Sequence, residues 1–246
     1  LGDVYKRQIL SSSFRFNLTP DASRDPQKPL YSIGATAEEF FAMQVLCRNV
    51  KKLFKITMSS RHEILSQLKM LLREDKSRYY IIRTDVCHCF ESIPHDKLFE
   101  YLEGNNLLDV KSKSLLRGLI RNEFETKNLR PLISTKKTGI PRGCAISSLL
   151  SEFYLSKIDE LLRHTLPGIV FLARYVDDII IVVHPDLDDE HWWSLDDYVK
   201  VLTDVYIRHG LTIHTPTDGT GKCYTYDSKD TKGLKFDLLG YTIQSI

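Results

Sequence analysis

The stretch RYVDDIIIVV, residues 174–183, places two adjacent aspartates between apolar residues. Another apolar run precedes it over residues 169–173, and both runs are short, β-branched and bounded, as buried strands are. Asp177 and Asp178 are therefore predicted to form the tip of a hairpin. Acidic turn residues are common, because Asp tolerates turn geometry. Neighbouring carboxylates repel each other unless a cation lies close by, so the segment is consistent with a solvated hairpin tip or with a metal site.

A second acidic position follows another strand-like run, residues 79–85, which ends at Asp85. Apolar residues at helical spacing begin near His95, so Asp85 lies where a strand passes into a loop. If this strand pairs beside the hairpin, three carboxylates converge. Such a cluster suits Mg²⁺, a hard cation bound by carboxylates together with substrate phosphates and water. Two such ions roughly 3.5–4 Å apart can activate an attacking oxygen and stabilise a leaving one in phosphoryl transfer.

The third feature is the loop GIPRG, residues 139–143, which precedes a predicted helix. Gly139 and Gly143 leave the backbone open to close approach by a ligand. The helix N-terminus that follows favours phosphate binding. Taken alone, a Gly-Pro loop before a helix is an ordinary feature.

Taken in this order, the segments resemble the palm of reverse transcriptases, over about residues 48–246. The resemblance is carried by four motifs: Asp85 to Phe90 with Ile93 and Pro94, GIPRG with Ser147, YVDD at residues 175–178, and LLGY at residues 238–241. Their order and spacing make the resemblance specific.

The resemblance implies an α/β fold of the α+β type. This is a right-hand polymerase palm with an antiparallel sheet and flanking helices, plus fingers, with the thumb missing. Residues 1–36 are expected to be a non-native or loose lead-in, and residues 37–246 the reverse transcriptase fingers and palm domain. The expected fingers, about 37–78 and 105–137, interleave with the palm, about 79–104 and 138–246. Helices are expected at about 96–104, 111–124, 145–163 and 190–209.

The resemblance also implies that Asp85, Asp177 and Asp178 are catalytic. With the backbone carbonyl of Val86 they would bind two Mg²⁺ ions, for which Mn²⁺ is an alternative. A bulky ring at Phe90 would crowd a ribose 2′-hydroxyl and favour deoxynucleotides, although a Phe below a strand end is also ordinary core. The other nucleotide- or template-binding candidates are Gly139, Pro141, Arg142, Gly143, Ser147, Tyr175, Arg61 and Lys222.

Three departures from the family pattern bear on the sub-family and the site. Arg142 stands where many members have Gln, and Ser148 where many have Pro. Both variants resemble abortive-infection and other defence-associated bacterial reverse transcriptases. A guanidinium at Arg142 would suit the template backbone or a nucleotide phosphate. The Lys that usually follows the segment ending at His214 is not directly there, and Lys222 is the nearest candidate.

Charge and cysteine usage fit this interpretation. The net charge of the 246 residues is +2, but residues 1–150 carry +9 and the remainder −7. A basic first part is typical of a region that follows a nucleic-acid backbone. The five cysteines lack the spacing of a zinc site, and a reducing, bacterial cytoplasm is expected. No run of 18 apolar residues exists, so no membrane segment is expected.

The predicted function is RNA-templated DNA synthesis by two-metal nucleotidyl transfer from a dNTP to a primer 3′-hydroxyl, in bacterial antiviral defence. The implied partners are an RNA template, a DNA primer or product, dNTPs, and a non-coding RNA or companion defence protein. Three alternatives stay open: template-independent or protein-primed DNA polymerisation, a palm RNA polymerase, and a catalytically silent nucleic-acid-binding palm module. An RNA polymerase usually carries an acidic residue shortly after the first Asp, where this chain has Phe90.

Overall fold

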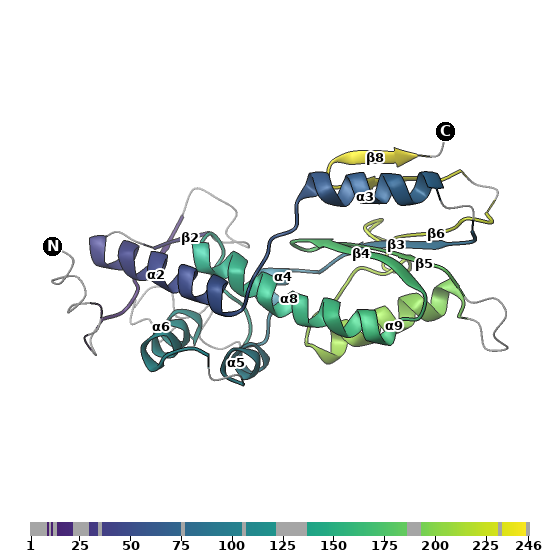
Figure 1. Ribbon diagram of the computed structural model, residues 1–246. Coiled ribbons are helices and arrows are strands. Elements are labelled where there is room, and N and C mark those ends of the chain that lie inside the picture. The colour runs from purple at the N-terminus through teal and green to yellow at the C-terminus, as the bar shows by residue number, and fades with distance from the viewer. Residues whose placement is uncertain are drawn as a thin grey trace. The chain divides into compact units, whose positions relative to one another are not determined.

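The computed structural model describes residues 9, 11, 14–21, 30–33, 36–74, 77–104, 107–121, 137–185, 193–230 and 233–244. The chain forms two compact units (Figure 1). Unit 1 comprises residues 1–57 and 90–154, and unit 2 comprises residues 58–89 and 155–246. Among the helices that the structure describes, none combines the length and apolar character needed to cross a membrane.

A four-stranded antiparallel sheet forms the centre of unit 2. Its strand order is β4-β5-β3-β6, from Ile169–Tyr175, Asp178–Val183, Tyr80–Asp85 and Tyr224–Asp227. The hairpin β4–β5 is local in the sequence, whereas β3 joins it from about a hundred residues earlier. The register pairs Tyr80 with Val183 at one end of β3 and Asp85 with Asp178 at the other.

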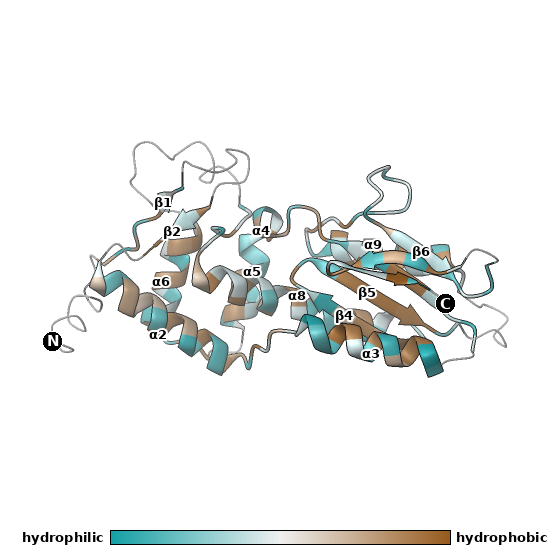
Figure 2. Ribbon diagram, turned by 90° about the horizontal axis from the view of Figure 1, so that it is seen from above, coloured by the Kyte–Doolittle hydropathy of each residue, from teal (hydrophilic) through white to brown (hydrophobic). Residues whose placement is uncertain are grey.

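Both faces of this sheet are covered. The helix α3 (Arg61–Glu74) and the hairpin of β7 (Lys235–Leu238) and β8 (Tyr241–Gln244) pack on one face, where Ile81, Ile180 and Val182 lie in a shared apolar cluster. The second half of α8 (Ala145–Thr165) and α9 (Leu195–Arg208) cover the other face (Figure 1). Every residue from Ile179 to Val183 is consequently at most 1% exposed, and Figure 2 shows most of β5 as apolar. A continuous apolar run is typical of a strand that is buried on both sides.

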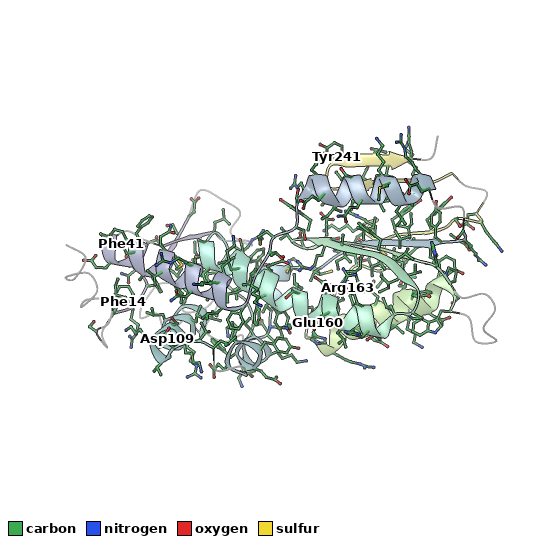
Figure 3. All side chains as sticks on the ribbon, in the orientation of Figure 1. Phe14, Phe41, Asp109, Glu160, Arg163 and Tyr241 are labelled. Atoms are coloured by element: carbon green, nitrogen blue, oxygen red, sulfur yellow. The ribbon has the colours of Figure 1, made fainter. Side chains whose placement is uncertain are left out.

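Individual side chains attach these layers to one another. Arg163 of α8, labelled in Figure 3, donates a hydrogen bond to the Leu172 carbonyl of β4 at 2.8 Å. The rings of Tyr80 on β3 and Tyr198 on α9 lie 6.0 Å apart in an edge-on arrangement. On the outer side of the unit, Tyr241 of β8 is 63% exposed (Figure 3).

Helices dominate unit 1. They are α2 (Ala37–Leu53), α4 (Cys89–Ser92), α5 (His95–Glu103), α6 (Val110–Arg121) and the first half of α8, and the strands β1 (Thr19–Pro20) and β2 (Tyr31–Ser32) form a short antiparallel pair. A capping box begins α2, in which Thr36 and Glu39 satisfy each other's backbone amides. The buried Glu39 side chain also accepts a hydrogen bond from the backbone amide of Asn17 at 2.6 Å. Phe16, Leu18 and Tyr31, which lie within the segment expected to be a lead-in, are buried.

The predicted fold class, mixed α/β with an antiparallel sheet and flanking helices, is confirmed. All three predicted strands form: β3 and β5 lie within one residue of the expected bounds, and β4 continues two residues beyond its predicted end, to Tyr175. The helices α5, α6 and α8 lie close to their predicted ranges. The fourth helix begins at Leu195 and not near residue 190, because Ser194 and Asp197 form a capping box. Residues 190–192 of the predicted helix lie outside the described residues. The division into fingers and palm stays a prediction.

Because β5 is buried on both faces, the stability of the protein should be most sensitive to shortening a side chain in this strand. Ile181→Ala should lower the free energy of unfolding by about 2–5 kcal/mol, because the side chain is fully buried and the space it leaves cannot collapse. Ile207→Ala on α9 is the matched control, since Ile207 is 57% exposed and its loss should change stability by less than ~0.5 kcal/mol. Urea denaturation measures both variants, and equal effects would contradict the packing described for β5.

Candidate active site

Three aspartates lie together at one end of the sheet in unit 2. Asp85 is the last residue of β3 and pairs across the sheet with Asp178, the first residue of β5. The Val86 amide donates a hydrogen bond to the Asp177 carbonyl at 3.0 Å, which holds the hairpin tip beside the end of β3. Residues that face each other across an antiparallel pair point to the same side of the sheet. The pairing therefore brings Asp85 and Asp178 onto one face, as the sequence predicted.

The hairpin turn holds a strained residue. Val176 has a φ of +58°, a left-handed conformation that is unusual for a β-branched side chain. Its carbonyl accepts a hydrogen bond from Arg174 Nη1 at 3.0 Å. Arg174 is 4% exposed and forms an ion pair with Asp159 of α8, with an N–O distance of 2.8 Å. This buried pair fixes the turn that presents Asp177 and Asp178.

Arg83, which lies outside the sequence motifs, neutralises part of the charge. Its Nη2 lies 2.9 Å from Asp178 Oδ1, and its Nη1 donates to the Lys222 carbonyl at 2.8 Å. Burial raises the pKa of Asp178, while the charge of Arg83 opposes that rise. The available signal was spacing, because residues two apart on a strand share a face, and Arg83 is two residues before Asp85.

Lys222 and His214 approach Asp85 from the segment that follows α9. The distances are 3.5 Å from Lys222 Nζ to Asp85 Oδ2 and 3.9 Å from His214 Nε2 to Asp85 Oδ1. The segment is attached to β3 by an isolated bridge between Val86 and Ile213 and by the His214 amide, which donates to the Asp85 carbonyl. Lys222, a candidate from the sequence, thus lies beside Asp85. The His214 side chain was not among the predicted site residues, and it faces the same carboxylate.

A tight turn supports this histidine. His214 Nδ1 and Asp218 Oδ2 lie 2.7 Å apart, and the Thr220 amide donates to Asp218 Oδ1 at 2.9 Å. Hydrogen bonds from Thr220, first the backbone amide and then the hydroxyl, hold the pKa of Asp218 well below its usual range. The Asp218 carboxylate therefore orients the imidazole whose other nitrogen faces Asp85.

The donor set suits a hard cation, although two of the three side chains, Asp85 and Asp178, contact protein cations. Within the residues that the structure describes, no three His, Cys, Asp or Glu side chains form a group that could hold a metal ion. In this arrangement Arg83 engages Asp178 and Lys222 approaches Asp85. Asp85 Oδ1 is buried without a hydrogen-bond partner, and a bound cation would satisfy it. Metal binding by the three aspartates stays a prediction.

The loop predicted from GIPRG lies in unit 1 and is attached to the residues around Phe90. The Gly139 amide donates to the Ile93 carbonyl at 2.8 Å, and the Ile140 amide donates to the Phe90 carbonyl at 2.7 Å. At the other end of the loop, Ser147 Oγ donates to the Pro141 carbonyl at 2.6 Å. The structure thus brings together the loop candidates and Phe90, all within one unit.

Gly143 is required by two features of the loop. Its φ is +88°, and a Cβ there would lie 2.7 Å from the Tyr31 carbonyl oxygen. Beside it, the Tyr31 amide donates to the Arg142 carbonyl at 2.7 Å. The strand β2 therefore packs its backbone directly on the loop backbone, at a distance that only glycine permits.

Two of the predicted ligand-binding arginines have partners within the protein. Arg142 Nη1 lies 3.0 Å from Glu91 Oε1, and its guanidinium lies 5.7 Å from the centre of the Phe90 ring. The sequence predicted a contact of Arg142 with template or phosphate, which stays untested. In unit 2, the Arg61 guanidinium lies 4.6 Å from the centre of the Tyr175 ring, so these two candidates contact each other.

A pair of glycine substitutions tests the close packing of the loop. Gly143→Ala should destabilise the protein by about 1–3 kcal/mol, because its φ is left-handed and the added Cβ clashes with the Tyr31 carbonyl. Gly118→Ala in α6 should stabilise it by about 0.5–1 kcal/mol, since a Cβ there meets no atom within 4 Å and alanine favours the helix. Chemical denaturation measures both, and shifts of the same sign would contradict this description of Gly143.

The buried ion pair below the hairpin gives a second prediction. Arg174→Met should lower the free energy of unfolding by about 3–5 kcal/mol, because it leaves the Asp159 carboxylate without its counter-charge. The double variant Arg174→Met/Asp159→Leu should recover part of this loss, since no unpaired charge remains. Urea denaturation again provides the measurement, and a double variant no more stable than Arg174→Met would refute the explanation.

Solved structures and curated proteins resemble the chain as follows. Two structures of apo telomerase from Candida tropicalis superpose with TM-scores of 0.58 and 0.54, at 14% and 16% identity, covering 95% and 96% of this chain and 48% and 54% of theirs. An uncharacterized 91 kDa protein in a cob intron of Schizosaccharomyces pombe is 26% identical over 184 residues, 66% of this chain and 21% of its own length. A putative COX1/OXI3 intron 2 protein of Saccharomyces cerevisiae is 32% identical over 85 residues, 35% of this chain and 10% of its own length.

The structural similarity supports the polymerase-like fold, and the chain spans about a fifth or less of the curated relatives it matches. The decisive comparison is with a family model described as reverse transcriptase (RNA-dependent DNA polymerase), which matches residues 32–243. Because this match includes both the aspartate cluster and the glycine loop, it agrees with the sequence motifs and covers most of the chain. The chain belongs to the reverse transcriptase family.

Proposed function

We propose that this chain catalyses RNA-templated DNA synthesis, in which a primer 3′-hydroxyl attacks the α-phosphate of a dNTP and pyrophosphate leaves. The observation that carries the proposal is the pairing of Asp85 with Asp178 at the end of two neighbouring strands. This pairing concentrates negative charge at one edge of a buried sheet, where it needs a cationic partner. Membership of the reverse transcriptase family supports the choice of reaction.

Asp85 and Asp177, with the Val86 carbonyl, are the proposed ligands of two Mg²⁺ ions, for which Mn²⁺ is an alternative. When bound, such ions activate the attacking oxygen and neutralise the phosphate charge. Asp178 would support the metal site from its edge, because Arg83 already engages one of its oxygens. The protein contributes mainly fixed positions and preorganised charge, which are the principal terms in phosphoryl transfer.

The cations near the aspartates have two proposed roles. In the free protein Arg83 and Lys222 offset the repulsion between the carboxylates, since they lie 2.9 Å from Asp178 and 3.5 Å from Asp85. During the reaction Lys222, whose side chain is 56% exposed, would be free to turn towards the triphosphate. An ammonium on a flexible stem can exchange one anionic partner for another at small cost.

Substrate choice is proposed to depend on Phe90, whose ring would exclude a ribose 2′-hydroxyl. The loop candidates Gly139, Pro141, Gly143 and Ser147 would contact nucleotide and template, and Tyr175 would lie near the primer end. Support for Phe90 comes from its attachment to the loop through the Ile140 amide. An RNA template and a DNA primer or product are the corresponding proposed partners.

The relatives of the chain bear on its biological role. Intron proteins of two fungi are among the relatives of the chain, and they favour a role linked to introns over the antiviral role predicted from the GIPRG loop. We therefore place the intron-linked role first and keep bacterial defence, with its companion RNA or protein, as the second candidate. The genes that flank this one would separate the two.

Primer extension on an RNA template with Mg²⁺ and dNTPs tests the proposed reaction. Asp177→Ala/Asp178→Ala should reduce the rate at least ~100-fold, because the preorganised charge at the reacting phosphate is lost. Asp196→Ala is the matched control, since it removes an exposed carboxylate from α9 and should leave the rate unchanged. Equal extension by the intact protein and the double variant would refute the assignment.

Further reaction mixtures separate the alternatives. Extension that continues without template would favour template-independent or protein-primed synthesis, and preferred use of NTPs would favour an RNA polymerase. A protein that extends nothing and shows no aspartate-dependent heat on titration with Mn²⁺ and a dNTP would be a silent palm module.

A further inference from the structure

The side chains of Phe90, Glu91 and Arg142 in unit 1 contact one another, and the proposed chemistry does not require these contacts. Phe90 and Glu91 are neighbours on α4, and Arg142 belongs to the GIPRG loop. The Arg142 guanidinium lies 5.7 Å from the centre of the Phe90 ring, and its Nη1 lies 3.0 Å from Glu91 Oε1. One cation thus contacts both the ring face and the neighbouring carboxylate.

The backbone presets this arrangement. The Ile140 amide donates to the Phe90 carbonyl at 2.7 Å, so the loop and α4 are joined at the residue that carries the ring. The Arg142 carbonyl accepts from the Tyr31 amide at 2.7 Å, and Gly143 packs against the same tyrosine backbone. These backbone contacts therefore hold the Cα of Arg142 close to Phe90 independently of the side-chain contact.

The burial of the Phe90 ring is incomplete. Phe90 is only half-buried, and α4 is a single helical turn. A guanidinium over the ring face is attracted by the π-electrons and blocks rotation towards that side. The Glu91 carboxylate holds the guanidinium in place by a charge-assisted hydrogen bond. Both charged side chains are 34% exposed, so the contact stays open to substrate and solvent.

We propose that Arg142 is a positioning residue for sugar discrimination: it clamps the Phe90 ring in the orientation that excludes a ribose 2′-hydroxyl, and Glu91 holds Arg142 over the ring. This inference rests on the proposed polymerase function and on the proposed role of Phe90. It differs from the direct contact with template or phosphate predicted from the sequence, in which Arg142 would affect all nucleotides alike.

The test compares kcat/KM for a dNTP and for the matching NTP in primer extension by the full chain. Arg142→Gln and Glu91→Gln should each lower the dNTP preference about three- to tenfold, mainly through faster NTP use, because the ring gains freedom to move aside. Arg142→Lys retains a cation and should give an intermediate preference. Arg117→Gln is the matched control, since it breaks a comparable ion pair with Glu103 in the same unit and should leave the preference unchanged.

A Phe90→Ala background shows whether Arg142 acts through the ring. In that background Arg142→Gln should leave the dNTP preference unchanged, because no ring remains to be clamped. An equal fall of kcat/KM for both nucleotides at constant preference would overturn the proposal in favour of a phosphate or template contact. A further change of preference without the ring would overturn it as well.

A measurement without catalysis keeps the clamp testable if the chain proves inactive. The protein is labelled with 4-fluorophenylalanine, and Phe90→Tyr identifies the resonance of residue 90 in the ¹⁹F spectrum. Arg142→Gln should shift and narrow this resonance as the ring becomes freer, whereas Arg117→Gln should not. An unchanged resonance would overturn the clamp, and an intact protein that incorporates neither nucleotide would overturn the proposed function instead.

Discussion

The antiparallel register between β3 and β5 is the constraint on which the site depends. It places Asp85 opposite Asp178, and a slip of one residue would turn one of the two carboxylates to the other face. The register is fixed by burial, because Ile81, Ile180 and Val182 must all enter the cluster beneath α3. Hydrophobic packing at one end of the strands thereby sets the position of charge at the other. Arg83 makes the resulting concentration of charge tolerable, since it lies on the same face and engages Asp178.

The parts of the fold that the sequence predicted are those determined by local pattern. The strands around Asp85 and Asp178 were visible as β-branched runs, and α8 as a long helical repeat of apolar residues after the GIPRG loop. The hairpin was visible because two such runs flank a pair of acidic residues, although its turn is Val176 and Asp177, one residue before the predicted tip, and Asp178 begins β5. Order and spacing of the motifs then indicated the family, which the match over residues 32–243 established. For the strands, the hairpin and the helix, the deciding information lay within each segment and the residues that flank it.

What the sequence did not predict depends on contacts between distant segments. Lys222 was a candidate for the nucleotide phosphates, but its approach to Asp85 was not predicted. The Thr84 hydroxyl donates to the His214 carbonyl and the Asp85 carbonyl accepts from the His214 amide, contacts across about 130 residues that have no local signature. Arg142 was predicted to contact template or phosphate because a guanidinium suits those groups, and its pairing with Glu91, 51 residues away in the sequence, has no local signature. Side-chain partners of this kind follow from the packed structure and not from periodicity. The same holds for the positive φ of Val176, which the flanking strands and the Arg174 contact impose.

The burial of β5 on both faces has a consequence for how the protein folds. Ile179 to Val183 form five consecutive β-branched residues without charge, a composition that favours intermolecular strand pairing when it is exposed. The hairpin with β4 forms from local contacts, but protection on the other edge needs β3, about a hundred residues earlier in the chain. Pairing over such separations is slow. Aggregation during folding should therefore begin at the strand that carries the active aspartate, and Asp177, Asp178 and His184 at its ends serve as charged or polar gatekeepers.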